Sequence, residues 1–199
     1  GPISSQTEQD TRHFSRFSKL PCFDPSSAQE AYEMIQEAFE YSEKYGTPVF
    51  LRPTTRVCHG YASIMVKDET EYTHHQPEGF IKDSKRWVIF PRLSFMNHKK
   101  IEARNQELSD IFSSYEKNTI HPSCDAFKNS KKGIATGGIS YTYTMETLKK
   151  TGMVKTLKIA TPHPFPEKLA VDFLSGLDEV LCLEELDPVI ERELIYICG

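Results

Sequence analysis

The sequence predicts an α/β protein built from two units, each with a parallel sheet. Two stretches carry this prediction. Residues 27–52 follow the pattern of a helix, a tight turn and a strand, which is half of a βαβ crossover. Residues 132–197 alternate strand and helix three times, an order typical of a doubly wound sheet with right-handed crossovers. The chain has 199 residues, of which 38% are hydrophobic, so one large or two small domains can form.

Composition excludes several classes of protein. The formal charge of −4 argues against a nucleic-acid-binding surface, which normally has a basic bias. No apolar run approaches the roughly 20 residues of a membrane span, and no signal peptide is visible. The number of cysteines is odd and their wide spacing excludes CxxC metal or cluster sites, so we expect reduced, mostly packed thiols in a cytoplasmic protein. The cysteines are Cys22, Cys58, Cys124, Cys182 and Cys198.

Residues 4–12 form a polar run that no amphipathic period explains. Phe14, Phe17 and Leu20 follow at helical spacing and predict a short helix that ends before Pro21. Arg12 and Arg16 are four residues apart and would share one face of that helix.

A second helix is predicted from Ser27, which with Glu30 fits a capping box, to Gly46, a left-handed terminator. Its wide apolar face suits packing on a sheet. This face has two stripes: Tyr32, Ile35, Phe39 and Ser42 in one, and Ala31, Met34, Ala38, Tyr41 and Tyr45 in the other.

The loop that follows the strand at 48–52 lies where ligands bind in open α/β sheets, beyond the carboxyl end of a strand. Thr54, Thr55, Arg56 and His59 are therefore candidates for lining a cleft. The alternative is that Arg56 and His59 are ordinary surface residues. Cys58 and His59 are not a catalytic pair, because neighbours on extended backbone point to opposite faces.

The middle of the chain is predicted to connect the two units. A charged helix is expected from Asn97, an acceptable N-cap, to Lys117, followed by a linker over 118–130. We therefore expect domains at 1–92 and 131–199, with a connecting helix and linker at 93–130.

The second unit is predicted to contain three strands, at 132–136, 154–160 and 179–184, fewer than the five or six of a complete doubly wound sheet. Gly137-Gly138 at a helix start could hold an anion, although two glycines after a strand are more often a simple turn. Glu184, Glu185 and Asp187 could do acid–base work, but acids before a helix more often cap it.

Four segments together resemble the alpha subunits of the indolepyruvate:ferredoxin oxidoreductases. These belong to the thiamine-diphosphate-dependent 2-oxoacid:ferredoxin oxidoreductases of anaerobes. Their order and spacing match along essentially the whole chain. The segments are Ser4–Phe14, Leu51–His59, Gly133–Tyr141 and Val180–Pro188.

The resemblance implies a partial pyrimidine-binding domain followed by a partial transketolase C-terminal-like domain. In that family an aryl 2-oxoacid is oxidatively decarboxylated on thiamine diphosphate, with coenzyme A as acyl acceptor. Electrons pass through [4Fe–4S] clusters to ferredoxin, and a beta subunit is the partner. The family's catalytic Glu, its Gly-Asp-Gly…Asn segment for Mg²⁺ and diphosphate, and its cluster cysteines are absent from this sequence. The chain therefore looks like an internal piece of the subunit, which should be inactive alone and hold no metal or cluster.

The resemblance also gives the polar run a role. A 2-oxoacid cleft needs donors for a carboxylate, and arginine is the bidentate choice. Arg12 is the first candidate and Arg16 the second, with Gln9 and Asp10 beside them. Ser4, Ser5 and Gln6 are candidates for the pyrimidine side of the cofactor. The alternative is that these polar residues only cap the helix that starts near Asp10.

Overall fold

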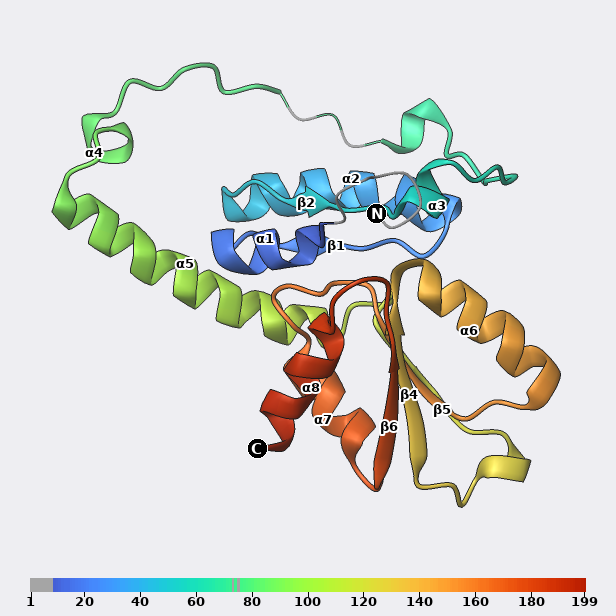
Figure 1. The fold of residues 1–199 in the computed structure, drawn as a ribbon. Helices are drawn as coiled ribbons and strands as arrows, with labels where there is room; N and C mark the ends of the chain where they lie inside the picture. The colour runs from blue at the N-terminus through green and yellow to red at the C-terminus, as the bar shows by residue number, and fades with distance from the viewer. Residues whose placement is uncertain (1–8, 73, 75) are drawn as a thin grey trace.

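The computed structural model of the chain describes residues 9–72, 74 and 76–199 and has two sheets (Figure 1). In the first unit β1 (Cys22–Phe23) pairs in parallel with β2 (Phe50–Leu51), and α2 (Ala28–Tyr45) connects them. In the second unit the strand order is β3-β5-β4-β6, and all neighbours are parallel except β3 and β5. The predicted α/β class with two parallel-sheet units is confirmed.

The second unit follows the predicted alternation closely. Figure 1 shows α6 on one side of the sheet and α7 and α8 on the other. One strand was missed, because β3 (Thr119–His121) lies in a stretch predicted to be a linker and is too short to show alternation. The other elements are β4 (Lys132–Gly137), α6 (Gly138–Thr151), β5 (Lys155–Ile159), α7 (Glu167–Leu174), β6 (Glu179–Leu183) and α8 (Val189–Cys198), with a 3₁₀ turn at Asp125–Phe127.

The first helix, α1 (Thr11–Ser18), turns its polar side inward. Phe14 and Phe17 are 53% and 86% exposed, whereas Arg12 and Ser15 are buried. The predicted short helix that ends before Pro21 is confirmed, but its phenylalanines do not form its buried face. The physical reason is that Arg12 finds buried carboxylate partners, described below, which a phenylalanine could not satisfy.

Helix α2 begins and ends at the predicted residues, but only half of the predicted capping box forms, because the Glu30 carboxylate accepts from the Ser26 N–H and hydroxyl instead of the Ser27 N–H. The Ser27 hydroxyl accepts from the Glu30 backbone N–H, and Gly46 adopts a left-handed φ of 56°. Only one of the two apolar stripes is buried: Met34 and Ala38 are covered, whereas Phe39 is 67% exposed. A sheet of two short strands covers one stripe and leaves the other free.

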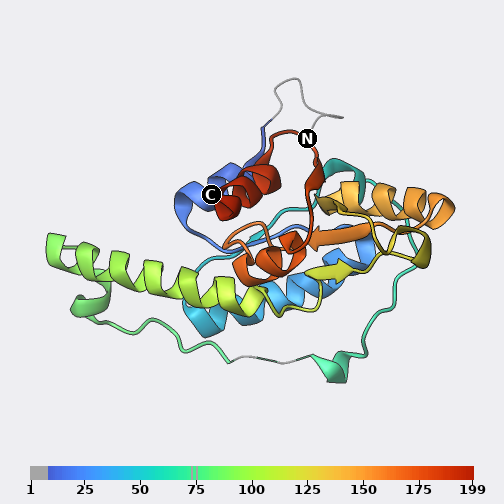
Figure 2. The same ribbon diagram turned by 90° about the horizontal axis from the view of Figure 1, so that it is seen from below.

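A long connecting segment joins the two units. It runs from α3 (Thr55–Cys58) through a 3₁₀ turn at Glu69–Glu71 and α4 (Ser84–Trp87) to α5 (Pro91–Phe112). Helix α5 starts six residues before the predicted Asn97, because Pro91 at its first turn needs no hydrogen-bonded N–H. Figure 2 shows the amino-terminal half of α5 projecting beyond both units.

The two units share a buried core instead of meeting at a wet boundary. Phe23 of β1, Leu108 and Phe112 of α5, and Ala160 after β5 belong to one hydrophobic cluster. The Asp24 N–H donates to the Ala160 carbonyl at 2.8 Å. This packing presses the first unit against the carboxyl ends of the strands of the second unit.

Candidate functional site

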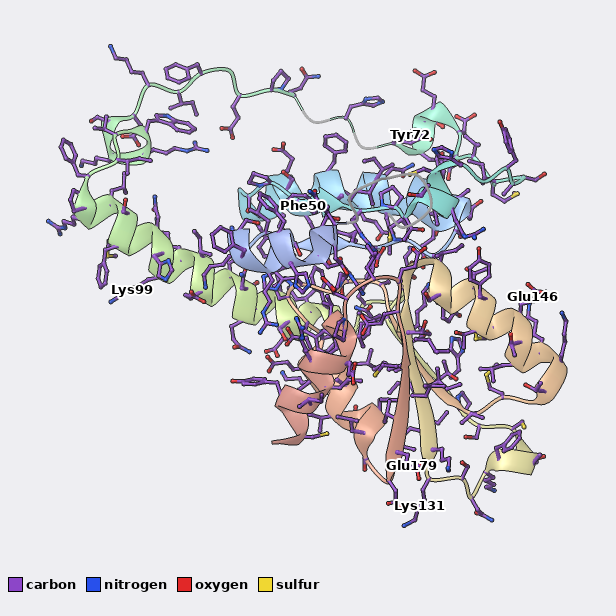
Figure 3. The ribbon with its side chains drawn as sticks, viewed as in Figure 1. Phe50, Tyr72, Lys99, Lys131, Glu146 and Glu179 are labelled. Carbon is purple, nitrogen blue, oxygen red and sulfur yellow. The ribbon has the colours of Figure 1, made fainter. Side chains whose placement is uncertain are left out.

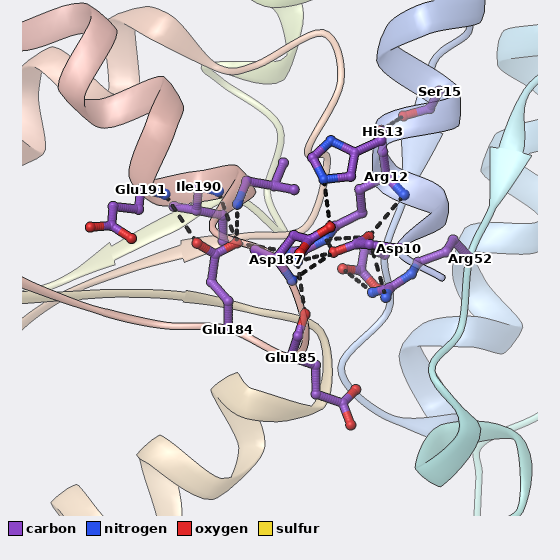
Figure 4. Close-up of polar contacts among 12 residues, drawn as sticks. Asp10, Arg12, His13, Ser15, Arg52, Glu184, Glu185, Asp187, Ile190 and Glu191 are labelled. Carbon is purple, nitrogen blue, oxygen red and sulfur yellow. Dashed lines mark hydrogen bonds and ion pairs between the residues drawn. The ribbon is translucent and has the colours of Figure 1, made fainter. Parts of the chain in front are cut away.

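A buried polar cluster lies where the start of α1 meets the loop between β6 and α8 (Figure 4). Asp10 is the N-cap of α1, and its carboxylate accepts from the Arg12 backbone N–H at 3.0 Å. The cap places the Arg12 side chain next to the carboxyl end of β6. The carboxyl ends of parallel strands are the usual place for a ligand site in an open α/β sheet.

Arg12 has all three guanidinium nitrogens engaged within the chain, and the residue is 3% exposed. Nε and Nη2 donate to the Asp10 carboxylate at 2.9 and 2.5 Å, and Nη1 donates to Glu184 at 2.6 Å. Nη2 also donates to the carbonyls of Glu185 and Asp187 at 2.8 Å. Burial opposes ionisation of Asp10, but the Arg12 guanidinium outweighs it and holds the pKa of the Asp10 carboxyl below its ordinary value.

Glu184 ties the same cluster to helix α8. Its Oε2 accepts from the N–H groups of Val189 and Ile190 at 3.1 and 2.8 Å, and its Oε1 accepts from the Glu191 N–H at 3.0 Å. Amide donors at a helix start favour a carboxylate. For Glu184 the capping interpretation is therefore confirmed.

A second buried carboxylate, that of Asp24, lies at the start of α6. Arg52 Nη1 donates to its two oxygens at 3.2 and 3.1 Å, and Arg52 Nη2 lies 3.7 Å from Asp10. A Cβ atom on Gly138 would lie 3.2 Å from each Asp24 oxygen, so the glycine allows the carboxylate this close approach. Burial raises the pKa of Asp24, although Arg52 and Arg12 oppose the rise. The space for an anion at Gly137-Gly138 thus holds a carboxylate of the chain itself.

Sequence reasoning missed Asp24 and Arg52 as members of this cluster. A usable signal existed, since each residue directly follows a strand of the first sheet, Asp24 after β1 and Arg52 after β2. Both strands have only two residues, so the rule about carboxyl ends was hard to apply to them.

The other sequence candidates are not joined to the cluster. Arg16 is half-exposed and pairs with Glu193 at 2.6 Å, and Gln9 is exposed. Arg56 lies over the Tyr143 ring at 5.8 Å. Among the described residues, no hydrogen bond or ion pair connects Thr54, Thr55, Arg56 or His59 to Arg12. Ser4, Ser5 and Gln6 lie outside the described residues.

Comparison with known proteins gives one consistent result. No known family profile matches the chain. Curated relatives named indolepyruvate oxidoreductase subunit IorA do match it. The chain is 37% identical to the protein of Methanothermobacter thermautotrophicus over 199 residues, which covers 99% of this chain. It is 38% identical to that of Pyrococcus abyssi over 196 residues (96% of this chain), and 32% identical to that of Archaeoglobus fulgidus over 191 residues (94%).

Over nearly its whole length this chain is similar to a segment of these indolepyruvate oxidoreductase IorA subunits. The resemblance expected from the four sequence segments is confirmed, and the relatives carry the name of an enzyme subunit. The chain spans about three tenths of the length of these relatives: 31%, 30% and 29% of the three proteins named. No helix among its described residues is long and apolar enough to cross a membrane.

The residues present in this chain do not fit the cofactors that the resemblance implies. Within the described part of the chain, the groups that could hold a metal reduce to Asp10, His13 and Asp187, with no cysteine among them. The Asp10 carboxylate already binds Arg12, and Asp187 Oδ2 lies 2.9 Å from His13 Nε2. The cluster is better explained as an ion-pair network than as a site for Mg²⁺ or [4Fe–4S], and the sequence lacks the diphosphate-binding segment.

His163 makes folding of this segment sensitive to mild acid. Burial, with Arg16, Lys19 and Arg104 nearby, lowers the pKa of its imidazole to about 4. The unfolded chain takes up the proton near pH 6.5, so stability present above pH 6.5 is lost as pH falls towards 4. We expect the free energy of unfolding to fall by about 2 kcal/mol over this range, allowing for partial exposure. Urea titrations from pH 7 to 4 measure this.

A His163→Gln variant should lose less stability over the same pH range. The matched control is His98→Gln, because the His98 side chain is 62% exposed on α5. The stability of the His98→Gln variant should depend on pH in the same way as that of the original chain. An identical pH dependence of the His163→Gln variant and the original chain would contradict the assignment.

Proposed function

We propose that this chain is the part of an indolepyruvate oxidoreductase alpha subunit that locks two α/β units together behind the cofactor cleft. The similarity over 99% of the chain supports this proposal most strongly. The whole enzyme would oxidatively decarboxylate an aryl 2-oxoacid such as indolepyruvate to the aryl-acetyl-CoA. Thiamine diphosphate, Mg²⁺ and [4Fe–4S] clusters would be held by other parts of the subunit. A beta subunit, ferredoxin and coenzyme A would be its partners.

Within this enzyme, Arg16 is a better candidate than Arg12 for the substrate carboxylate. The Arg16 side chain is 56% exposed and has one carboxylate partner, Glu193. It lines a cavity of about 550 Å³ together with Lys19, His163 and Tyr196. Arg12 is a weaker candidate because it is buried and its nitrogens already reach two carboxylates and two carbonyls of the chain.

Activity assays test the proposal at two levels. The 199-residue chain should show no turnover of indolepyruvate with coenzyme A and a viologen acceptor, because the residues that hold the cofactors lie elsewhere. The intact alpha subunit with its beta subunit should turn over indolepyruvate or phenylpyruvate. Turnover by the chain alone, or a preference of the intact enzyme for pyruvate or 2-oxoglutarate, would contradict the proposal.

A second candidate function is a purely non-catalytic scaffold, which is favoured by the pairing of Arg12 within the chain. An Arg16→Ala variant of the intact enzyme distinguishes a substrate contact from a scaffold. A higher KM for the 2-oxoacid with kcat kept supports a substrate contact, since an arginine–carboxylate contact made in the ground state is lost. Unchanged KM and kcat support the hypothesis that this segment is a non-catalytic scaffold. Arg192→Ala on the neighbouring helix α8 is the matched control, because Arg192 is exposed and does not line the cavity.

A further inference from the structure

A cavity of about 990 Å³ lies between helix α5, helix α4 and the carboxyl end of helix α2. Five cationic and two acidic side chains line it, which leaves a formal charge of +3. Among the described residues, none of the five cations has a carboxylate within 4.0 Å. Like charges around one cavity repel one another, so the arrangement favours an anion between them. The five are Lys44 of α2, Lys85 and Arg86 of α4, and Lys100 and Arg104 of α5.

Two of these cations are oriented by neutral partners. Arg104 Nη2 donates to the Lys19 carbonyl at 2.8 Å and to the Asn105 side-chain oxygen at 3.3 Å. Burial lowers the pKa of Arg104, and no nearby acid opposes the change. The Lys44 ammonium lies 5.1 Å from the centre of the Tyr45 ring. Contacts of this kind orient a cation without neutralising it, so its charge stays available to a ligand.

The uncharged part of the lining suits an organic molecule. Leu20, Leu93 and Ile101 supply aliphatic surface, and Tyr45 lies beside them. The Tyr45 hydroxyl is buried and has no hydrogen-bond partner within the described part of the chain, which costs free energy unless a ligand or water satisfies it. The volume lies in the range of sites for small organic ligands and is far more than inorganic phosphate needs.

We propose that this cavity binds an organic molecule that carries two or more phosphate groups and an apolar or aromatic part. Arginine and lysine are the side chains that bind phosphate oxygens. One phosphate group carries at most about two negative charges, so an excess of three positive charges favours more than one group. The cavity shares no lining residue with the cavity that contains Arg16. The inference goes beyond the proposed function, because it assigns a separate site and needs no turnover.

Isothermal titration calorimetry of the 199-residue chain at low ionic strength tests the site. Coenzyme A and ADP are the two probes, because both combine phosphate groups with an aromatic base. Inorganic phosphate and adenosine supply only the anion or only the uncharged part. At least one probe should bind about tenfold or more tightly than either control, and added salt should weaken it. Binding of coenzyme A without ADP would identify coenzyme A as the occupant, and binding of both would point to nucleotides in general.

A variant with Lys85→Gln and Lys100→Gln removes one cation from each of two helices that line the cavity. It should bind the probe at least about tenfold more weakly. Both lysines are exposed, and glutamine has a similar helix propensity, so the risk to folding is small. The matched control is Lys82→Gln with Lys99→Gln, which changes the net charge equally outside the cavity lining and should bind as the original chain does. Figure 3 shows Lys99 on the side of α5 that faces away from α1 and α2.

NMR spectra locate the binding. The amide signals of Gly46 and Thr47, which line the cavity, should shift when the probe is added. Shifts around Arg16 and His163 instead, in the other cavity, would overturn the proposal.

Three results of the calorimetry would also overturn it. The first is that neither probe binds more tightly than inorganic phosphate. The second is that the cavity variant and its control lose affinity equally. The third is that a poly-glutamate peptide binds where neither probe does, which would assign the cavity to an acidic segment of another protein. Turnover is measured separately in the activity assays, so failure of this proposal and failure of the proposed function are distinguishable.

Discussion

Replacing Arg12 by alanine will lower the free energy of unfolding by about 3–5 kcal/mol. The reason is the state of the carboxylates left behind. Asp10 and Glu184 have side chains that are 0% and 6% exposed, and both depend on the Arg12 guanidinium. Removal of the cation leaves two buried negative charges close together and two carbonyls, of Glu185 and Asp187, without their donor. Urea denaturation at pH 7 measures the effect.

Two further variants separate this cluster from a general effect of losing an arginine. Arg16→Ala removes a half-exposed guanidinium from the same helix and should cost less than about 1 kcal/mol. Arg12→Lys keeps the charge, but one ammonium cannot reproduce the planar guanidinium that binds Asp10 and Glu184 at the same time. Its loss of unfolding free energy should therefore lie between those of Arg16→Ala and Arg12→Ala. Small and equal losses of unfolding free energy for Arg12→Ala and Arg16→Ala would contradict a stabilising role of the Arg12 cluster.

Arg12 also shows where sequence reasoning reaches its limit. The 3.6-residue period correctly predicted a helix beginning near Asp10, and Phe14 and Phe17 gave it an apolar side. Period alone cannot say which side is buried when the partner is a carboxylate 172 residues away. The long-range pairing of Arg12 with Glu184 decides the orientation of α1, and no local signal encodes it.

The second unit was easier to predict, for a physical reason. Its strands have five or six residues and alternate with helices, so pattern and topology agree. Strands β1, β2 and β3 have two or three residues, which is too short for an alternation of apolar and polar residues to show. The contact between the units depends on these short strands and on isolated side chains such as Asp24. It could not be assembled from the sequence, and the division into domains at 92 and 130 stays a prediction.

A second buried ion pair joins the two units. Glu30 of α2 and Lys158 of β5 are each 7% exposed, and the Lys158 ammonium donates to Glu30 Oε1. The second oxygen of Glu30 accepts from the N–H and hydroxyl of Ser26, each at 2.6 Å. Lys158 also lies 4.6 Å from the centre of the Tyr141 ring. Glu30 is therefore fully satisfied, but only while the ammonium is present.

Lys158→Met should cost about 3–5 kcal/mol of unfolding free energy, because it leaves Glu30 buried and uncompensated. Adding Glu30→Gln should restore much of this loss. The amide keeps an oxygen for the Ser26 donors and removes the charge, and methionine fills the volume of the lysine stem. Urea denaturation of the two single variants and the double variant gives the coupling between the two positions.

An independent readout comes from His121. Burial and the nearby Lys158 charge lower the pKa of its imidazole, whose Nε2 lies 2.9 Å from the Tyr141 hydroxyl. In Lys158→Met the charge is gone and burial remains, so the His121 pKa measured by NMR should rise part of the way to its ordinary value. Lys150→Met, in an exposed pair with Glu146, should change neither stability nor the His121 pKa. A double variant less stable than Lys158→Met alone would contradict this explanation. The buried Glu30 carboxylate would then not be the source of the stability lost in Lys158→Met, and the packing of the Lys158 side chain would matter more than its charge.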